Sequence, residues 1–223
     1  MDISFGNACP VPTFISSSQA QEIDKRLLDI GYTIGQLVEL AGLSISQAIY
    51  HYYPPSKDIH KKPIILIGPG NNGADGLVVA RHLARYGYMP TLVIVKQFSP
   101  ASLNSSLLKI CEHLNICIVD SLSKAAHCGF IIDAVLGFGS TGSVIKEPYG
   151  TLIDQVVQIN PSLLISIDVP TGWLVDHDNS NRAGLIRPHT LISLTLPVRA
   201  YLPYCRNCLP NRLRGFIFWL QIY

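Results

Sequence analysis

Long apolar runs and charged residues are both scarce in this sequence. No stretch reaches the roughly 20 consecutive apolar residues that a membrane-spanning helix needs, and the late apolar run 215–223 is short enough to predict a strand instead. Charged residues make up 14% of the chain and hydrophobic residues 48%, which is the reverse of the balance that favours disorder. We therefore expect one large folded domain that spans residues 1–223.

Signals for a nucleic-acid surface or for export are also missing. The formal net charge is only +2, too small to indicate a nucleic-acid surface. Basic residues do gather late in the chain, at Arg199, Arg206, Arg212 and Arg214. We interpret them as a solvated tail. Residues 1–14 lack the basic and apolar regions of a signal peptide and the Arg-rich character of a transit peptide. We expect a cytoplasmic protein, with a mitochondrial location left open, and no membrane or nucleic-acid partner.

A disulfide framework is not expected either. The cysteines are scattered, at Cys9, Cys111, Cys117, Cys128, Cys205 and Cys208. A chain of this size folds without covalent staples, so a reducing compartment is the simpler interpretation. Cys205 and Cys208 form a CxxC pattern, but no second pair of ligands stands at the spacing of a zinc site. Two ordinary thiols are therefore favoured over a metal centre.

The first quarter of the chain has the pattern of helices. Ser or Thr is followed three residues later by Gln at Ser18/Gln21, Thr33/Gln36 and Ser44/Gln47. This spacing is typical of a capping box, in which two side chains satisfy open backbone donors. Apolar residues recur behind each pair at helical spacing, and Pro54 and Pro55 end the pattern. We predict an α-helical lead-in of three amphipathic helices.

From Lys61 onward, short apolar runs alternate with amphipathic segments. The runs that predict strands are 63–68, 91–96, 116–120, 130–135, 163–168 and 190–196, and those that predict helices are 75–85, 103–114 and 152–159. Continuous apolar strands separated by helices are typical of a parallel sheet covered on both faces. The predicted fold class is therefore α/β, a Rossmann-like three-layer αβα sandwich with a mostly parallel central sheet.

A glycine-rich segment, GPGNNGADG at 68–76, follows the first predicted strand. It contains GxGxxG between a strand and a helix, the context in which backbone N–H groups cradle a phosphate. A simple dinucleotide fold should have an acid at the end of its second strand, and Lys96 stands there instead. A tight turn with Asp75 capping the next helix is the alternative. Four glycines in nine residues favour a binding loop.

Two further strand ends carry polar residues. DAVLGFGSTGS begins at Asp133 and offers backbone and hydroxyl donors to a phosphate, although a flexible connection is an equal alternative. In SIDVPTGW, Asp168 closes an apolar strand, and Pro170 restricts the residue before it, so the turn should hold Asp168 near Thr171. A carboxylate at an apolar strand end is a candidate for acid–base work; a helix or turn cap is the alternative.

Together these segments resemble a known family. GPGNNGADGLVVARHL, IIDAVLGFG and SIDVPTGW occur in the order and spacing of the NAD(P)H-hydrate epimerases (the YjeF N-terminal domain), as do IGQLVELAGLS and LISLTLP. The resemblance covers about Ser18 to Pro197. It implies an isomerase of nicotinamide nucleotide repair, which interconverts the R and S forms of hydrated NADH and NADPH (NADHX and NADPHX) as a homodimer with one potassium ion per subunit.

The resemblance also implies roles for particular residues. Asp168 would be the catalytic acid–base group and would also bind substrate, and the potassium ligands would be Asn72, Asp133 and Thr171. The remaining substrate-binding positions would be Asn71, Asn72, Gly73, Ala74, Asp75, Gly137, Phe138, Gly139, Ser140, Thr141, Gly142 and Ser143.

Departures from the family pattern leave two other function classes open. Ala74 replaces a family glycine and should cost the loop freedom, Ser143 stands where an acid is usual, and the segment 198–223 diverges. A non-catalytic binding or scaffold protein on the same fold, linked to lipoprotein binding or to RNA decay, is the first alternative. An ordinary NAD(P)-dependent oxidoreductase is the second, and Lys96 argues against it. Asn72, Asp133 and Asp168, present together, favour the epimerase.

Overall fold

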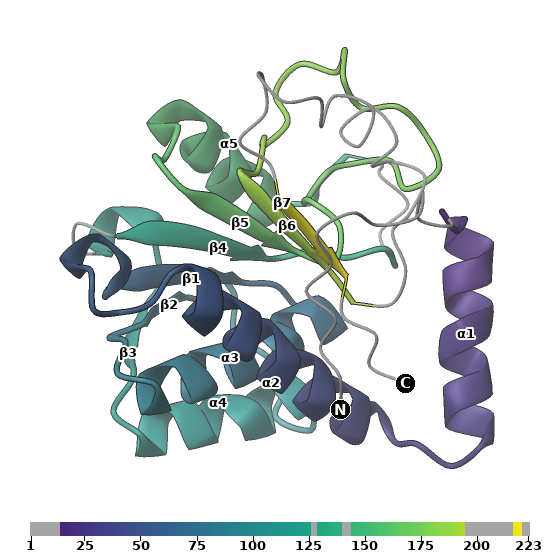
Figure 1. The fold of residues 1–223 in the computed structure, drawn as a ribbon, viewed down its shortest axis with the longest axis horizontal. Coiled ribbons are helices and arrows are strands. Elements are labelled where there is room, and N and C mark those ends of the chain that lie inside the picture. Colours follow the sequence, from purple (N-terminus) through teal and green to yellow (C-terminus); the bar gives the residue numbers. More distant parts are fainter. Residues whose placement is uncertain (1–13, 126–128, 140–143, 195–215, 220–223) are drawn as a thin grey trace.

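The computed structural model describes residues 14–125, 129–139, 144–194 and 216–219, drawn in colour in Figure 1. The helices are α1 (Ser17–Asp29), α2 (Ile34–Tyr52), α3 (Asn71–Arg85), α4 (Leu103–His113) and α5 (Tyr149–Ile159), with short 3-10 turns at Asp58–His60 and Leu122–Lys124. The strands are β1 (Pro63–Ile67), β2 (Thr91–Val93), β3 (Cys117–Val119), β4 (Phe130–Ala134), β5 (Leu164–Ile167), β6 (Thr190–Ser193) and β7 (Phe216–Trp219).

All of these strands belong to one sheet, in the order β3-β2-β1-β4-β5-β6-β7. Every pairing is parallel, so the predicted mostly parallel sheet is confirmed and is more uniform than expected. The strand order reverses direction between β1 and β4. In open parallel sheets, ligands bind beyond the carboxyl ends of the strands at such a reversal. The topology therefore directs attention to the segments that follow β1 and β4.

Helices cover both faces of the sheet, which confirms the three-layer sandwich (Figure 1). Along β1 the side chains alternate between two cores: Ile65 and Ile67 pack with α2, α3 and α4, whereas Ile64 and Leu66 pack with α5. Every residue of β1 is buried. A strand buried on both faces reads as a continuous apolar run, which is why the sequence identified it.

The N-terminal region contains two helices in place of the three that were predicted. Thr33 and Gln36 form the expected capping box of α2. Ser44 and Gln47 lie inside α2, because the apolar spacing continues without interruption through Ala41, Ile45 and Ile49. The capping box of α1 is Ser16 with Gln19, two residues earlier than the predicted Ser18/Gln21. The same spacing occurs twice in this segment, and the structure uses the first.

Helix α1 stands apart from the layers of the sandwich at one side of the molecule (Figure 1). Ser17 fixes its N-terminal end, because the Ser17 backbone N–H and hydroxyl both donate to Asp176, at 2.9 and 2.5 Å. Ala20 packs in a small cluster with Val169 and Trp173, beyond the end of β5. Helix α1 is thus attached to the segment that follows β5.

Several sequence-based predictions concern residues outside the described ranges. These are the solvated basic tail, the CxxC of Cys205 and Cys208, and all of the divergent segment 198–223 except β7. Cys111 and Cys117, which are described, carry free thiols, buried and exposed respectively. Among the described residues, no helix is long and apolar enough to cross a membrane.

Candidate active site

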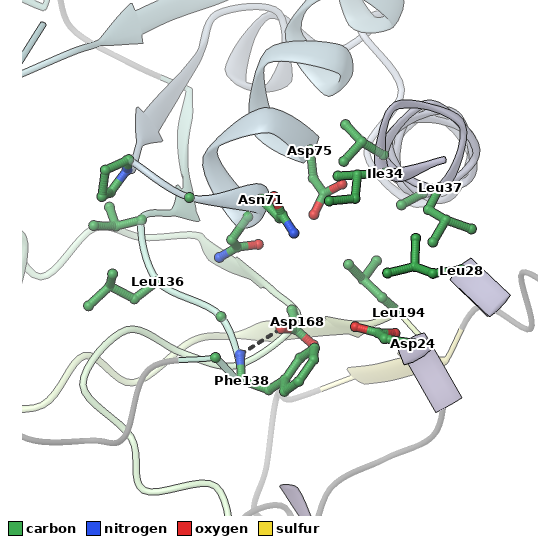
Figure 2. A pocket seen from close by; sticks show the side chains of 18 residues that line it. Asp24, Leu28, Ile34, Leu37, Asn71, Asp75, Leu136, Phe138, Asp168 and Leu194 are labelled. Carbon is green, nitrogen blue, oxygen red and sulfur yellow. Dashed lines mark hydrogen bonds between the residues drawn. The ribbon is translucent and has the colours of Figure 1, made fainter. Parts of the chain in front are cut away.

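A cavity of about 440 Å³ lies beyond the carboxyl ends of β1, β4 and β5 (Figure 2). This volume is within the usual range for small-molecule sites. Its wall consists of Asp24 and Leu28 of α1, Ile34, Leu37, Val38 and Ala41 of α2, Pro69 to Asn72, Asp75, Val135 to Gly139, Asp168 and Leu194. Segments that follow four strands (β1, β4, β5 and β6) and two N-terminal helices therefore meet around one space.

The glycine-rich segment forms the tight passage from β1 into α3. A β-carbon added to Gly73 would lie 2.0 Å from the Gly68 carbonyl oxygen, so only glycine allows this closure. The Asn104 side-chain amide donates to the carbonyls of Gly68 and Gly70, at 3.3 and 3.1 Å, and holds the turn. The N-terminal end of α3 thereby faces the cavity, the arrangement that suits an anionic group.

Helix α3 begins at Asn71, a turn earlier than the predicted start at Asp75. Gly70 is the N-cap, so the alternative of Asp75 as a capping residue is wrong. Ala74 has helical backbone and packs, fully buried, with Val38 and Val78. The expected loss of loop freedom at Ala74 is therefore wrong as well, because alanine is favoured in a helix.

Asn72 lines the cavity and has one polar side-chain atom without a partner among the described residues. The residue is 8% exposed, and its amide nitrogen donates weakly to the Ile167 carbonyl at 3.4 Å. Among the described residues, Oδ1 of Asn72 has no hydrogen-bond partner. A buried acceptor without a donor costs free energy unless a ligand, an ion or water satisfies it. Asn72 therefore indicates that something binds here.

Asp133 ties the ends of β4 and β5 together. Oδ1 accepts from Val135 N–H and the Thr171 hydroxyl, at 3.2 and 2.7 Å, and Oδ2 accepts from the Ser166 hydroxyl and Thr171 N–H, at 3.0 and 2.9 Å. The residue is fully buried, and burial raises the pKa of its carboxyl against the opposing effect of these donors. Four donors occupy the four acceptor positions of a carboxylate.

Asp168 follows β5 in a left-handed backbone conformation, with φ of 64°. Few residues other than glycine, asparagine and aspartate adopt this conformation readily. Its Oδ2 accepts from the Phe138 backbone N–H at 2.8 Å, and a β-carbon on Gly137 would lie 2.4 Å from the same oxygen. Burial raises the pKa of Asp168 to about 6; the Phe138 donor opposes this, and the charge of Asp24 adds to it.

Two further carboxyl groups line the cavity. Burial raises the pKa of Asp75 well above its ordinary value, and the charges of Asp168 and Asp24 raise it further. Burial alone raises the pKa of Asp24, on α1. Figure 2 shows all three side chains around the same space, from three different elements. Like charges around one poorly solvated space oppose each other's ionisation.

Sequence reasoning missed Asp24 and the apolar wall from α1 and α2. A signal was present: Ala20, Asp24 and Leu28 are spaced four residues apart, which places a charge within the inward stripe of the helix. Of the residues predicted to bind substrate, Asn71, Asn72, Asp75, Gly137, Phe138, Gly139 and Asp168 line the cavity. Gly73 and Ala74 lie behind it, and Ser140 to Ser143 are outside the described residues.

A second cavity of about 530 Å³ adjoins the first, and both contact Pro69, Leu136 and Gly139. Its wall includes Lys96 at the end of the β2 segment and Lys146 before α5. The two cavities are continuous at these shared residues and form one extended site; the first is lined by three carboxyl groups, and the second by two lysines and Glu147.

Comparisons with known proteins agree with this arrangement. Residues 34–200 match the family described as YjeF-related protein N-terminus. The NAD(P)H-hydrate epimerase of Schizosaccharomyces pombe is 40% identical over 192 residues, which cover 82% of this chain and 77% of that protein. The NAD(P)H-hydrate epimerase of Giardia intestinalis is 34% identical over 218 residues, 84% of this chain and 79% of that protein.

A solved structure has the same fold. The crystal structure of the yeast protein ynu0 (YNL200c) superposes with a TM-score of 0.78 at 32% identity, and the match covers 86% of this chain and 84% of the yeast chain. Family match, relatives and structure extend over most of the chain. This chain belongs to the YjeF-related protein N-terminus family.

Proposed function

We propose that this protein interconverts the R and S epimers of hydrated NADH and NADPH, with Asp168 transferring the proton. One observation supports this most directly: Asp168 faces a cavity at the reversal point of the sheet, with a pKa raised to about 6. A general acid–base group works best when its pKa lies near the working pH. The relatives named as epimerases share most of the chain.

The reaction requires only a positioned proton donor and acceptor. The hydrated ring carries a hydroxyl on a carbon bonded to the ring nitrogen. When Asp168 protonates that hydroxyl, the nitrogen lone pair expels it as water and a planar iminium results. Water adds back to this carbon and gives up a proton to a carboxylate. No hydride is transferred, so the reaction needs no redox partner.

The rest of the substrate would bind along the extended site. The apolar wall from α2 suits the nicotinamide ring, and the N-terminal end of α3 suits phosphate. The second cavity, with Lys96 and Lys146, suits the adenosine end and its additional phosphate in NADPHX. Binding energy from this remote part would hold the reacting carbon against Asp168.

We further propose that potassium binds next to Asn72, whose Oδ1 is buried without a partner among the described residues. An amide oxygen is a suitable ligand for a hard cation. Asp133 and Thr171 would contribute mainly by charge and by holding the surrounding backbone, because their hydrogen bonds to one another are already formed. When bound, the ion would neutralise substrate phosphate and order the loops.

A homodimer is the proposed assembly. The lead-in has fewer helices than the sequence predicted, but its corner exposes Leu28, Ile30, Tyr32 and Ile34, which a second copy would cover. Static light scattering at micromolar concentration should give twice the mass of one chain. A monomer in that measurement would contradict the proposal.

The decisive test of activity starts from a single epimer of NADHX. Purified protein should convert it to an equilibrium mixture, followed by chromatography, faster than buffer alone. Activity in this assay would exclude the non-catalytic scaffold, which no described residue favours. A change in nicotinamide absorbance at about 340 nm, which reports hydride transfer, would instead indicate an oxidoreductase. Absence of both would contradict the proposed function.

A further inference from the structure

The reaction just proposed needs a proton-transfer group on each face of the ring. A carboxyl on one face protonates the hydroxyl that leaves from that face. If water then returns beside the same carboxyl, the starting epimer forms again. Net epimerisation requires water to add from the opposite face, where a different group must accept the proton. Asp168 is held in one wall by the Phe138 N–H, so a second group in another wall would have to serve the opposite face.

Asp24, on another wall of the cavity, can act as this second proton-transfer group. The titratable residues in the described wall of the cavity are Asp24, Asp75 and Asp168. Asp75 also lines the cavity, but it belongs to α3 and is only 5% exposed. Asp24 is only half-buried and projects from α1, whereas Asp168 and Asp75 come from the segments that follow β5 and β1 (Figure 2).

The surroundings of Asp24 argue against a purely structural role. Among the described residues, its carboxyl has no hydrogen bond or ion pair, and burial without such partners costs stability. It also approaches the carboxyls of Asp168 and Asp75 closely enough to raise the pKa of each. The unsatisfied Oδ1 of Asn72 in the same wall independently indicates that this space takes a ligand.

We propose that Asp24 is the second catalytic acid–base residue, serving one face of the bound ring while Asp168 serves the other. This rests on the proposed function. Protonated Asp24 gives its proton to the departing hydroxyl, and the C–O bond breaks to give water, the iminium and the Asp24 carboxylate. Water then forms the new C–O bond on the opposite face and loses its proton to the Asp168 carboxylate. The other epimer reacts by the reverse sequence.

Helix α1 precedes the residues 34–200 that match the family. The docking of α1 by Ser17 on Asp176 places Asp24 at the cavity. The site is therefore complete only when α1 is docked on the segment that follows β5.

Asp24→Asn in the full chain tests this proposal. The amide keeps the shape of the carboxylate but cannot exchange a proton, so kcat for epimerisation of NADHX should fall about 10²–10⁴-fold with KM changed little. The melting temperature should stay the same or rise, because a buried like charge is removed. In the wild type, one group acting as acid and one as base should make kcat fall at both low and high pH. In Asp24→Asn, one of these two limbs of the pH profile should disappear. Asp29→Asn, on an exposed position of the same helix, should match the wild type.

The outcomes separate the two claims. If wild-type protein epimerises NADHX and Asp24→Asn does so within about threefold with the same two-limbed pH profile, Asp24 is not an acid–base residue while the proposed function stands. A lower melting temperature with an unchanged profile would likewise assign Asp24 a structural role and overturn the proposal. If wild-type protein does not epimerise NADHX, the proposed function fails, and the role of Asp24 fails with it.

Discussion

Thr171 binds Asp133 twice, with its hydroxyl donating to Oδ1 at 2.7 Å and its backbone N–H to Oδ2 at 2.9 Å. Both residues are fully buried. The hydroxyl also accepts from Leu136 N–H at 3.0 Å. One threonine therefore connects the turn that carries Asp168 with the glycine-rich segment after β4. It fixes these two parts of the cavity wall relative to each other.

Replacing this hydroxyl should destabilise the fold. Thr171→Val keeps the shape of the side chain, but it removes one of the two donors to Asp133 Oδ1 and leaves the Leu136 N–H without its acceptor. The free energy of unfolding should fall by about 1–3 kcal/mol. Urea denaturation measures this value. Thr171→Ser should recover most of it. Thr151→Val removes an exposed hydroxyl bond to Glu147 and serves as the control, with a change within about 0.5 kcal/mol. Equal losses in the two valine variants would contradict the role of Thr171.

The role of Asp168 can be separated from its contribution to folding. Asp168→Asn should reduce the epimerisation rate about 10²–10⁴-fold, because asparagine cannot exchange the proton. Binding of the hydrated nucleotide should fall much less, since the glycine-rich segments and the second cavity hold its phosphates in our proposal. Asparagine tolerates the left-handed backbone at this position, so folding should be retained. Near-normal turnover in the well-folded variant would eliminate the proposed mechanism.

The same substitution makes a prediction about pH. The pKa of Asp168 is raised to about 6 in the folded protein, from the ordinary 3.8. The folded state therefore holds its proton more tightly than the unfolded state, and this contribution to stability is fully present below pH about 4 and is lost as pH rises through about 6. The stability of wild type relative to Asp168→Asn should fall across this window and stay level above it. Urea titrations at pH 4.5, 6.0 and 7.5 would reveal the trend; a difference that grows with pH would contradict it.

Potassium should raise the melting temperature more than an equal concentration of tetramethylammonium, because a ligand of the folded state alone stabilises it. For a chain of this size, 1 kcal/mol corresponds to about 2–4 °C. Asn72→Leu should abolish the difference between the two salts. It is a cleaner variant than Asp133→Ala, which breaks four hydrogen bonds. Asn181→Leu, on an exposed loop, should retain the potassium effect. Equal melting temperatures in both salts for the wild type would exclude the site.

The sequence predicted the parts of the fold that follow from local pattern. β1 and β4 are buried on both faces and are largely apolar, so short continuous runs identified them. The capping pattern at Ser44 predicted a helix start that does not exist. Apolar contacts of Ala41 and Ile45 favour a continuous α2 across this position, and a cap forms only where a helix starts. At α1, burial of Ile15 and the bond from Ser17 to Asp176 select between two equivalent patterns.

The candidate site was predictable where a motif follows a strand, and not where tertiary packing creates it. Gly68 to Asp75 and Asp168 follow strands, and Asp133 lies near the end of β4; the strand order brings these ends together. Asp168 is held by Phe138, 30 positions away, and the approach of Asp24 depends on the contact between Ser17 and Asp176, separated by 159 positions. No local pattern encodes such contacts.

Helix α1 is attached through one serine and a small apolar cluster, so the stability of the sandwich and the completeness of the active site can vary independently. The sandwich has its core without this helix, whereas the cavity loses a wall and a carboxyl when the helix detaches. Detachment of α1 would therefore be invisible to most measurements of global stability and would still empty the site. Local opening at residues 17–29 would remove this wall without unfolding the sandwich, and amide exchange in that segment would report how often it occurs.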